Sequence, residues 1–482
     1  MSRREHYAAA TPGETTTTST AWSEAARLTF TPGVGKTYVV FWSVEAANKG
    51  NTTTDVRLRV AVDGASAVEA NIESRSTLEY PSYAGFFPIA GDGAAKAVTI
   101  EVAAEAAGVN VAARNGNLVA LALTGQDVYA ESLGRTAVTS NAFTTVVSAT
   151  WNPPAGDCLI LASCLTDNFA TTAPVYGRLE FDGAATPDTG AGHAEVAAGQ
   201  ASVVPLGMIW RRTVTAEGAK TAAWRVRAHT SNNEIGSTDN RLLILDLSGF
   251  DQAFYGEIAD AHHAGTEASF TPALTVSGSA SGNPHLVLAA WSIAALNNSL
   301  MMETRLVEDE TPIGLSPKRT FSALFERGAF QGVVALRTGI GPGVRTWSVE
   351  RRSDGTNTAA VRMGSALAAL DLGADAEAYA LAAESADLAL GGGTAHLSRG
   401  YSGPASTSAW SLTAAPAKLE ARRVLRTSAA ALALTPWPAG LAARGDSAWT
   451  PPPSPDATAW LPVGGPLTAW TPAPAAAAAN WS

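Results

Sequence analysis

The chain has 482 residues, a net charge of −10, only 16% charged residues and two cysteines. This length predicts roughly three to four domains. We find no dense Lys/Arg cluster, so a nucleic-acid partner, which needs a basic patch, is not expected. Two cysteines are too few for a disulfide-stapled secreted scaffold. Residues 1–7 lack the apolar segment of a signal peptide, and no apolar run reaches roughly 18 residues, so neither export nor membrane insertion is expected.

The first predicted elements are strands. Residues 38–42 are apolar on both faces, as in a central buried strand. Residues 56–62 alternate between apolar and polar side chains, which indicates a strand with one wet face, and an Asp–Gly turn follows at 63–64. The same order recurs at 158–162 and 178–183, and again at 285–291 and 304–308.

Cys158 and Cys164 lie on one of these strands, six residues apart. On a straight strand they face the same side about 20 Å apart. A disulfide needs Cα atoms within about 7 Å. We therefore expect two buried free thiols.

An internal repeat governs the domain organisation. Ile100, Trp224 and Trp347 occupy matching segments 124 and 123 residues apart, and the apolar strands ending near Leu123, Leu247 and Leu372 repeat at steps of 124 and 125. Such a period indicates a domain copied in tandem. The expected fold is mainly β, with three antiparallel, jelly-roll-like β-sandwiches in which Ile100, Trp224 and Trp347 are equivalent buried residues. The expected domains are 1–127, 128–251 and 252–375, followed by a β-repeat tail at 376–482.

The tail is rich in Trp, Pro and Ala. Leu388, Trp410 and Leu432 begin matching segments at steps of 22 residues. A unit of this size cannot bury its apolar face alone, so it predicts stacked β-hairpins or a β-solenoid that packs on neighbouring units or chains. A low-complexity linker is the alternative, although a solvated linker gains nothing from tryptophans. The candidate oligomerisation or attachment residues are Trp410, Trp437, Trp449, Trp460, Trp470 and Trp481.

No motif predicts catalysis, a cofactor or a metal. Residues 32–37 resemble the end of a phosphate-binding loop, but Phe30 replaces a required Gly and a strand follows where a helix is needed. Residue types that could bind zinc cluster in the second linker, where a solvated segment is the simpler interpretation. They are Glu257, Asp260, His262 and His263.

Polar segments near the strand ends are candidate glycan contacts. Asn, Asp and Thr can hydrogen-bond sugar hydroxyls, although they are also ordinary turn residues. The segments fall at equivalent places in the three repeats, so we expect them in equivalent loops. The candidates are Asn115, Asn232, Asn233, Asp354 and Asn357.

The chain resembles virion structural proteins of tailed bacteriophages or phage-like gene transfer agents of alphaproteobacteria, of the tail fibre, head spike or decoration type. The resemblance rests on small-residue-rich strands, on the turns after Leu123 and Leu247, and on the tail repeat typified by residues 410–415. It implies a non-enzymatic homo-oligomer on a virion, made in the bacterial cytoplasm, with other virion proteins as partners. It also implies contact with a host-surface polysaccharide. We expect the tail to mediate oligomerisation or attachment and the sandwiches to project outward, with the reverse polarity as the alternative.

Three other functions stay open at this point. One is a capsid or tail decoration protein with a purely structural role, and another is a bacterial carbohydrate-binding surface protein. The third is an enzyme such as a polysaccharide lyase or hydrolase, which would need clustered carboxylates. The acidic run at 308–310 ends a strand and is typical of a wet turn instead.

Overall fold

The computed structural model contains two compact units, Met1–Ala376 and Glu377–Ser482. Regular structure in the described residues is almost entirely β-strand, with one short 3-10 helix, η1, at Leu247–Gly249, so the predicted mainly-β class is confirmed. In the part of the chain that the structure describes, no helix has the length and apolarity needed to span a membrane. The described residues are 4–50, 54–72, 80–167, 175–187, 189–191, 203–229, 234–259, 262–295, 300–313, 318–321, 329–338, 340–354, 356, 358–373, 396–397, 410–412, 420–421 and 432–434.

Sandwich 1 consists of two four-stranded antiparallel sheets. The inner sheet has the order β1-β8-β3-β6, and the outer sheet has the order β2-β7-β4-β5. Pairing of the first strand with the eighth and of the second with the seventh is the topology of a jelly roll, as predicted. The strands are β1 (His6–Thr17), β2 (Ser23–Phe30), β3 (Thr37–Asn48), β4 (Val56–Val62), β5 (Ala65–Ile72), β6 (Ser82–Ala90), β7 (Lys96–Ala104) and β8 (Val111–Ala122).

Sandwich 2 repeats this topology. Its inner sheet has the order β10-β18-β12-β16 with β9 also on β18, and its outer sheet has the order β11-β17-β13-β14 with β15 also on β13. The strands are β9 (Val128–Ser132), β10 (Thr136–Val138), β11 (Thr144–Trp151), β12 (Gly156–Asp167), β13 (Val175–Phe181), β14 (Ala184–Ala185), β15 (Thr189–Ala191), β16 (Val203–Val214), β17 (Lys220–Ala228) and β18 (Ile235–Asp246).

Sandwich 3 follows the same plan. Its inner sheet has the order β19-β29-β22-β28-β20 with β26 on β22, and its outer sheet has the order β21-β27-β23-β24 with β25 on β23. The strands are β19 (Gln252–Glu257), β20 (His263–Gly265), β21 (Thr271–Ala280), β22 (His285–Ala295), β23 (Leu300–Glu308), β24 (Thr311–Pro312), β25 (Lys318–Phe321), β26 (Ala329–Arg337), β27 (Gly343–Arg352), β28 (Ala359–Val361) and β29 (Ala366–Asp371).

The strand registers correct one predicted equivalence. Ile100 pairs with Val60, and Trp224 pairs with Leu179, at matching points of the two outer sheets. In sandwich 3 the matching residue is Val349, because Val349 faces Leu306. Trp347 is equally buried but lies two residues earlier on the same face of its strand. The equivalence of Trp347 with Ile100 and Trp224 is therefore wrong.

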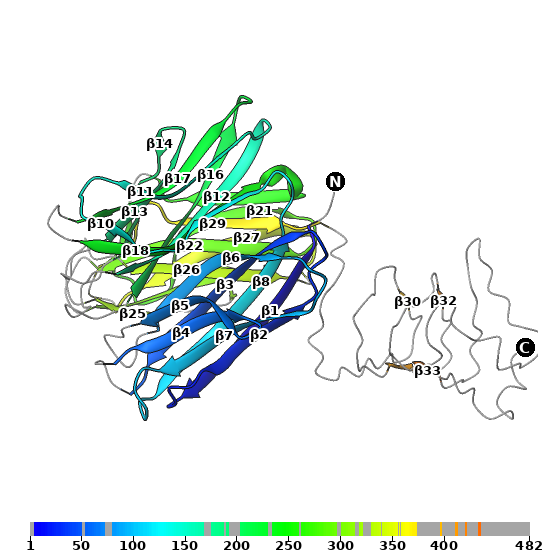
Figure 1. Ribbon diagram of the computed structural model, residues 1–482, viewed down its shortest axis with the longest axis horizontal. Helices are drawn as coiled ribbons and strands as arrows, with labels where there is room; N and C mark the ends of the chain where they lie inside the picture. Colours follow the sequence, from blue (N-terminus) through cyan, green and yellow to red (C-terminus); the bar gives the residue numbers. More distant parts are fainter. Residues whose placement is uncertain are drawn as a thin grey trace, which may run out of the picture. The chain divides into compact units, whose positions relative to one another are not determined.

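The inner sheets of the three sandwiches pack against one another (Figure 1). This explains why their central strands are apolar on both faces. One face of β22 belongs to the core of sandwich 3 itself, and the other face belongs to an apolar cluster shared with sandwiches 1 and 2. The residues of the first face are Val287, Ala289, Trp291 and Ile293, and those of the second are Leu286, Leu288 and Ala290.

All chain connections between sandwiches lie at one end of this unit, which we call the proximal end. In each inner sheet the start of the first strand pairs with the end of the last, as in His6 with Leu121. Arg4 donates hydrogen bonds to Asp127 and to the Asp246 carbonyl, which joins the N-terminal segment to both linkers. The chain leaves the unit at the same end, where the amide of Leu372 donates to the Pro284 carbonyl.

The second unit contains four short described strands, all paired in parallel. Strand β30 (His396–Leu397) pairs with β32 (Glu420–Ala421), and β31 (Trp410–Leu412) pairs with β33 (Leu432–Leu434). The second pair has the predicted step of 22 residues, whereas the first has a step of 24. Hairpin strands are antiparallel, so parallel pairing at this step is the pattern of a solenoid.

The prediction for the two cysteines is confirmed. Cys158 and Cys164 both lie on β12 and are buried free thiols. Burial raises the pKa of Cys158 to about 12 and that of Cys164 to about 11. The indole nitrogen of Trp224 lies 3.3 Å from the sulfur of Cys164, inside sandwich 2.

Candidate functional site

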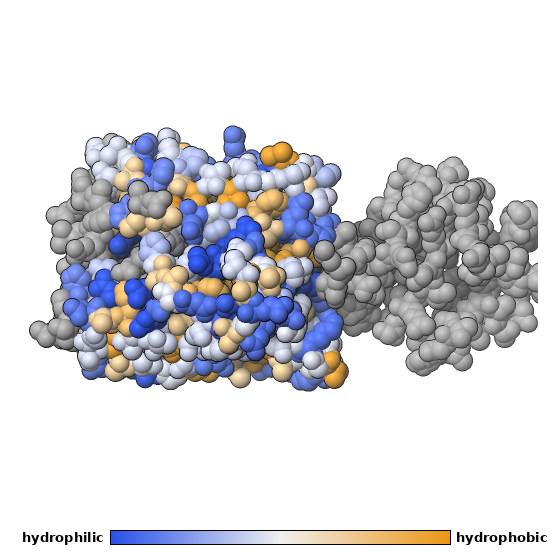
Figure 2. All heavy atoms as spheres, turned by 90° about the horizontal axis from the view of Figure 1, so that it is seen from above, coloured by the Kyte–Doolittle hydropathy of each residue, from blue (hydrophilic) through white to orange (hydrophobic). Residues whose placement is uncertain are grey.

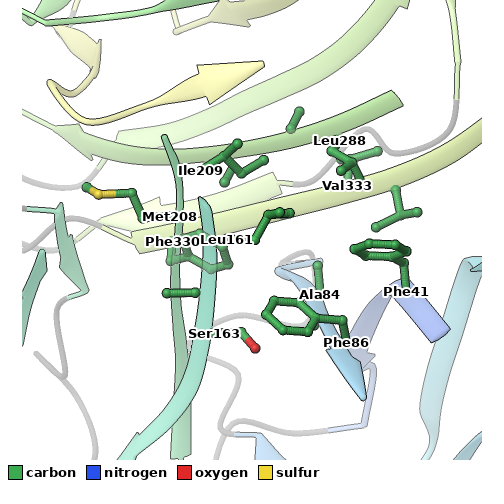
Figure 3. A pocket seen from close by; sticks show the side chains of 16 residues that line it. Phe41, Ala84, Phe86, Leu161, Ser163, Met208, Ile209, Leu288, Phe330 and Val333 are labelled. Carbon is green, nitrogen blue, oxygen red and sulfur yellow. The ribbon is translucent and has the colours of Figure 1, made fainter. Parts of the chain in front are cut away.

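The junction of the three inner sheets is the best-defined internal feature of the first unit. Strands β3, β12 and β22 contribute residues from matching positions, and so do β6, β16 and β26. The first set is Phe41, Leu161 and Leu288, and the second set is Phe86, Ile209 and Val334. Figure 3 shows Phe41, Phe86, Leu161, Ile209 and Leu288 around one small cavity. Each sandwich therefore supplies one third of a pseudo-threefold apolar centre.

Small residues let the sheets approach at this centre. A Cβ on Gly332 would lie 2.5 Å from the Cβ of Ala84, closer than real Cβ contacts. A Cβ on Gly207 would lie 3.0 Å from the ring of Phe330. The remaining cavity has a volume of about 40 Å³ and a mostly apolar lining, and ligand pockets have volumes of about 300–1,000 Å³. We conclude that the centre is a packing interface.

Sandwiches 1 and 3, which are farthest apart in sequence, are also joined by buried hydrogen bonds. The hydroxyl of Ser82 donates to the Gly332 carbonyl at 3.0 Å and accepts from the Gly332 amide at 2.9 Å. The hydroxyl of Ser43 accepts from the Val334 amide at 3.1 Å. The side-chain oxygen of Gln331 accepts from the Ser82 amide at 2.8 Å. These bonds satisfy buried polar groups and close the ring of three sandwiches.

A buried ion pair fastens the proximal end. Arg4 Nη1 lies 2.5 Å from Asp127 Oδ2, and both side chains are fully buried. Arg4 also donates to the Asp246 carbonyl at 2.9 Å, and its guanidinium lies 4.2 Å from the ring centre of Phe250. No sequence pattern predicted this group, since a single arginine near the N-terminus belongs to no motif.

The outer sheets carry a second repeated feature, an aromatic ring beneath arginines. We call the end of the unit away from the linkers the distal end. At this end an aromatic residue directly precedes the first outer strand of each sandwich: Trp22 before β2, Phe143 before β11 and Phe270 before β21. In each case two guanidinium groups lie over the ring, at 4.1–5.2 Å from its centre. The arginines are Arg57 and Arg59, Arg178 and Arg227, and Arg305 and Arg352.

The predicted glycan loops are only partly observed, and one assignment is wrong. Asn115 lies inside β8 at a β-bulge, with φ of 53°, so it is not in a loop between strands. The matching residue of sandwich 2 is Asp239, which also has positive φ. Asp354 is exposed and accepts hydrogen bonds from Thr356. Asn232, Asn233 and Asn357 lie outside the described residues.

The tail tryptophans are also mostly outside the described residues. Trp410 begins β31, whereas Trp437, Trp449, Trp460, Trp470 and Trp481 are not described.

Few of the described residues could support metal or acid–base chemistry. Among the described residues, no three His, Cys, Asp or Glu side chains are placed to hold a metal ion. His262 accepts a hydrogen bond from the Met363 amide, whereas Asp260 is not described. His285 is buried, donates from Nδ1 to the Asn283 carbonyl, and lies 3.9 Å from Asp371 through Nε2. Burial lowers the pKa of His285 below its ordinary value, so the neutral ring is the favoured form.

Comparisons with known proteins add likenesses of fold at low similarity. No protein-family profile and no curated sequence matches the chain. A solved structure of PNGF-II is 9% identical, covers 70% of this chain and 98% of its own, and has a TM-score of 0.27. A triple jelly-roll protein from the turret of an archaeal virus is 9% identical, with coverage of 70% and 83% and a TM-score of 0.18. The CBM22-1–CBM22-2 tandem domain of Paenibacillus barcinonensis Xyn10C is 10% identical, with coverage of 50% and 93% and a TM-score of 0.16. Likenesses this weak carry no argument about activity.

Proposed function

We propose that this chain is a non-enzymatic virion appendage, a tail fibre or head spike that assembles as a homo-oligomer on a phage-like particle. Residues 376–482 attach it to the particle and to other copies. The three-sandwich unit presents its distal end to a glycan of the host surface.

The observation that carries the proposal is the polarity of the three-sandwich unit. The N-terminal segment, both linkers and the exit at Gly373 lie at the proximal end, where Arg4 and the Leu372–Pro284 hydrogen bond hold them. The distal end is therefore free of connections to the rest of the chain. An appendage needs this arrangement, with attachment at one end and a recognition surface at the other.

The tail supports attachment through its strand pairing. Among the described tail residues, the parallel pairs β30–β32 and β31–β33 are each two-stranded sheets with two edges. Parallel repeats bury their apolar faces only by stacking, and their terminal edges pair with other chains unless they are capped. A second copy or a particle protein would supply that cover.

The junction supports a mechanical role. Three jelly rolls that share one apolar cluster and the Ser82–Gly332 hydrogen bonds cannot rotate freely against one another. The face shown in Figure 2 mixes hydrophilic and hydrophobic residues, with the apolar ones in scattered patches. Such a surface suits a solvated, rigid projection.

The test uses the organism that carries the gene. A tagged full chain and a tagged chain ending at residue 376 are expressed in it, and particles are purified and examined by immunogold microscopy. We expect the full chain on particles and the shortened chain as a soluble monomer by light scattering, absent from particles. If the full chain is absent from particles and found on the cell envelope, it is a carbohydrate-binding surface protein and the proposal is wrong.

Two further outcomes would redirect the assignment. If the shortened chain is incorporated but particles no longer adsorb to the host, the tail is the recognition tip and the polarity is reversed. If deletion of the whole gene leaves adsorption unchanged while the protein is present on normal particles, the chain is a decoration protein.

A further inference from the structure

The outer sheets differ in charge at one matching pair of positions. In each outer sheet, one arginine faces a residue on the neighbouring strand. The strand pairs are β4 and β7 in sandwich 1, β13 and β17 in sandwich 2, and β23 and β27 in sandwich 3. In sandwiches 1 and 3 the facing residue is a glutamate, but in sandwich 2 it is a second arginine. The facing pairs are Arg59–Glu101, Arg178–Arg225 and Arg305–Glu350.

The arginines of sandwiches 1 and 3 are each paired with the facing glutamate. Arg59 Nε donates to Glu101 at 2.6 Å, and Arg305 Nε donates to Glu350 at 2.6 Å. Each guanidinium thus has a carboxylate directly opposite. Opposite charges at facing positions stabilise a sheet.

In sandwich 2 two guanidinium groups share one carboxylate. Glu180 accepts from Arg225 Nη1 at 2.5 Å and from Arg178 Nη2 at 3.5 Å. The Nε atoms of Arg178 and Arg225 are themselves buried and have no hydrogen-bond partner, so only the Nη groups can face a ligand. The two side chains remain 28% and 27% exposed, so solvent reaches both. Like charges at facing positions destabilise a sheet, and a protein tends to retain such a local conflict where it has a use.

Phe143 contacts both arginines of this pair, and a third arginine, Arg227, lies beside them. The guanidinium of Arg178 lies 4.2 Å from the ring centre of Phe143, and Arg225 Nη2 donates to the Phe143 carbonyl at 2.8 Å. Arg227 lies over the ring of Tyr176 at 4.2 Å. Charged guanidinium groups held in this way can hydrogen-bond an oxyanion through the N–H groups that remain on their Nη atoms.

We propose that Arg178 and Arg225 form a binding subsite for the acidic groups of an anionic polysaccharide. The pair lies on an open sheet face, which suits an extended polymer better than an enclosed small molecule. The chain as a whole carries a net charge of −10, which repels polyanions in general, so binding of one needs a local group of basic side chains such as this pair. The inference rests on the proposed function and specifies the chemistry of the glycan that the appendage would bind.

The matching glutamates provide the test variant. Arg225→Glu places opposite Arg178 the residue that sandwiches 1 and 3 carry at that position, so the variant gains the facing ion pair of those sandwiches and should fold. Arg27→Glu is the control, since it makes the same charge change at a side chain that is 52% exposed and away from the subsite. Melting temperature is measured for both variants to verify folding.

Binding of the purified full chain is measured by biolayer interferometry at about 50 mM salt, where screening is weak. The probes are immobilised polygalacturonate, a phosphate-bearing mannan, neutral dextran and a single-stranded DNA oligonucleotide. We expect binding to one or both acidic polysaccharides, about tenfold weaker for Arg225→Glu and unchanged within about twofold for Arg27→Glu. The two acidic probes show whether a carboxylate or a phosphate is the group recognised.

The inference is overturned if neither acidic polysaccharide binds, if Arg225→Glu binds as well as the unsubstituted chain, or if DNA binds equally well. Arg225→Glu should still be incorporated into particles in the immunogold experiment. Loss of polysaccharide binding with normal incorporation therefore separates this inference from the proposed attachment role.

Discussion

Removal of the Arg4 guanidinium should loosen the proximal end of the three-sandwich unit. Arg4 and Asp127 form a fully buried ion pair, and Arg4 also bonds the Asp246 carbonyl and stacks on Phe250. Arg4→Met keeps an apolar stem and removes the charge. The Asp127 carboxylate would then be buried with only the amides of Thr124 and Asp246 and the Thr124 hydroxyl as donors.

The expected cost follows from this geometry. Breaking a buried ion pair by removing one partner costs about 3–5 kcal/mol. The three donors that remain on Asp127 place the expected value at the low end, about 3 kcal/mol. For a unit of this size the unfolding entropy is roughly 0.8 kcal/mol per kelvin, so cooperative unfolding would lower Tm by about 4 °C.

Urea denaturation of four proteins provides the assay: the unsubstituted chain, Arg4→Met, Asp127→Asn and the double variant. We expect the double variant to lose about 2 kcal/mol less than the sum of the single losses, because the second substitution removes a charge that the first has already orphaned. Arg27→Met, which breaks the exposed pair with Glu24, is the control and should cost at most about 1 kcal/mol. Additive single losses, or an Arg4→Met loss no larger than the control, would refute the reasoning.

Three other predictions test packing and ionisation. Gly332→Ala should cost about 1–3 kcal/mol by urea denaturation, because its Cβ would meet Ala84 at 2.5 Å, and Ala84→Gly in the same chain should restore most of that loss. Burial lowers the pKa of His285 below 6.5, so the unfolded chain takes up a proton that the folded chain does not. The urea midpoint should therefore fall as pH drops from about 6.5 to 5. His285→Gln should reduce this dependence of the midpoint on pH, and an unchanged dependence would contradict the assignment. With pKa values of about 12 and 11, Cys158 and Cys164 should not react with Ellman's reagent at about pH 8 until the chain is unfolded, and rapid labelling of the native protein would show that they are accessible.

Local patterns in the sequence predicted the sandwiches because each strand is governed by neighbours close in the chain. The Asp–Gly turns illustrate this. Asp63 and Gly64 both have positive φ, as a two-residue hairpin turn requires. Asp309 and Glu310 adopt the same conformation, so these two residues of the acidic run form the expected turn although it lacks the glycine. Glu308 does not belong to the turn, because it ends β23 and is buried.

The two wrong assignments concern residues whose side-chain type suggested a position that the strand register does not give them. Trp347 attracts attention as an aromatic, yet Val349 is the residue that faces Leu306 and so matches Trp224. The Asn-rich segment at 115 looks like a turn, but asparagine tolerates positive φ and serves a bulge inside β8. Strand pairing fixes both positions, and pairing depends on residues far away in sequence.

The junction was predictable only in part. Strands that are apolar on both faces must be buried on both faces, and the sequence shows this for residues 38–42. The partner of the second face could not be inferred, since Phe41 meets Leu161 and Leu288 from the other two sandwiches. Small residues such as Gly332 were likewise indistinguishable from turn or bulge glycines until Ala84 was seen beside them.

Fusion of three jelly rolls into one chain gives this protein a freedom that a symmetric trimer lacks. In a homotrimer, one substitution at the axis changes three side chains at once. Here Phe86, Ile209 and Val334 fill matching positions with different volumes. The same independence lets Arg225 occur in sandwich 2 while the other two sandwiches keep their glutamates and the stability those pairs confer. A pseudo-threefold unit can therefore keep two sheets optimised for folding and place a charge conflict, with the binding that we infer from it, on the third.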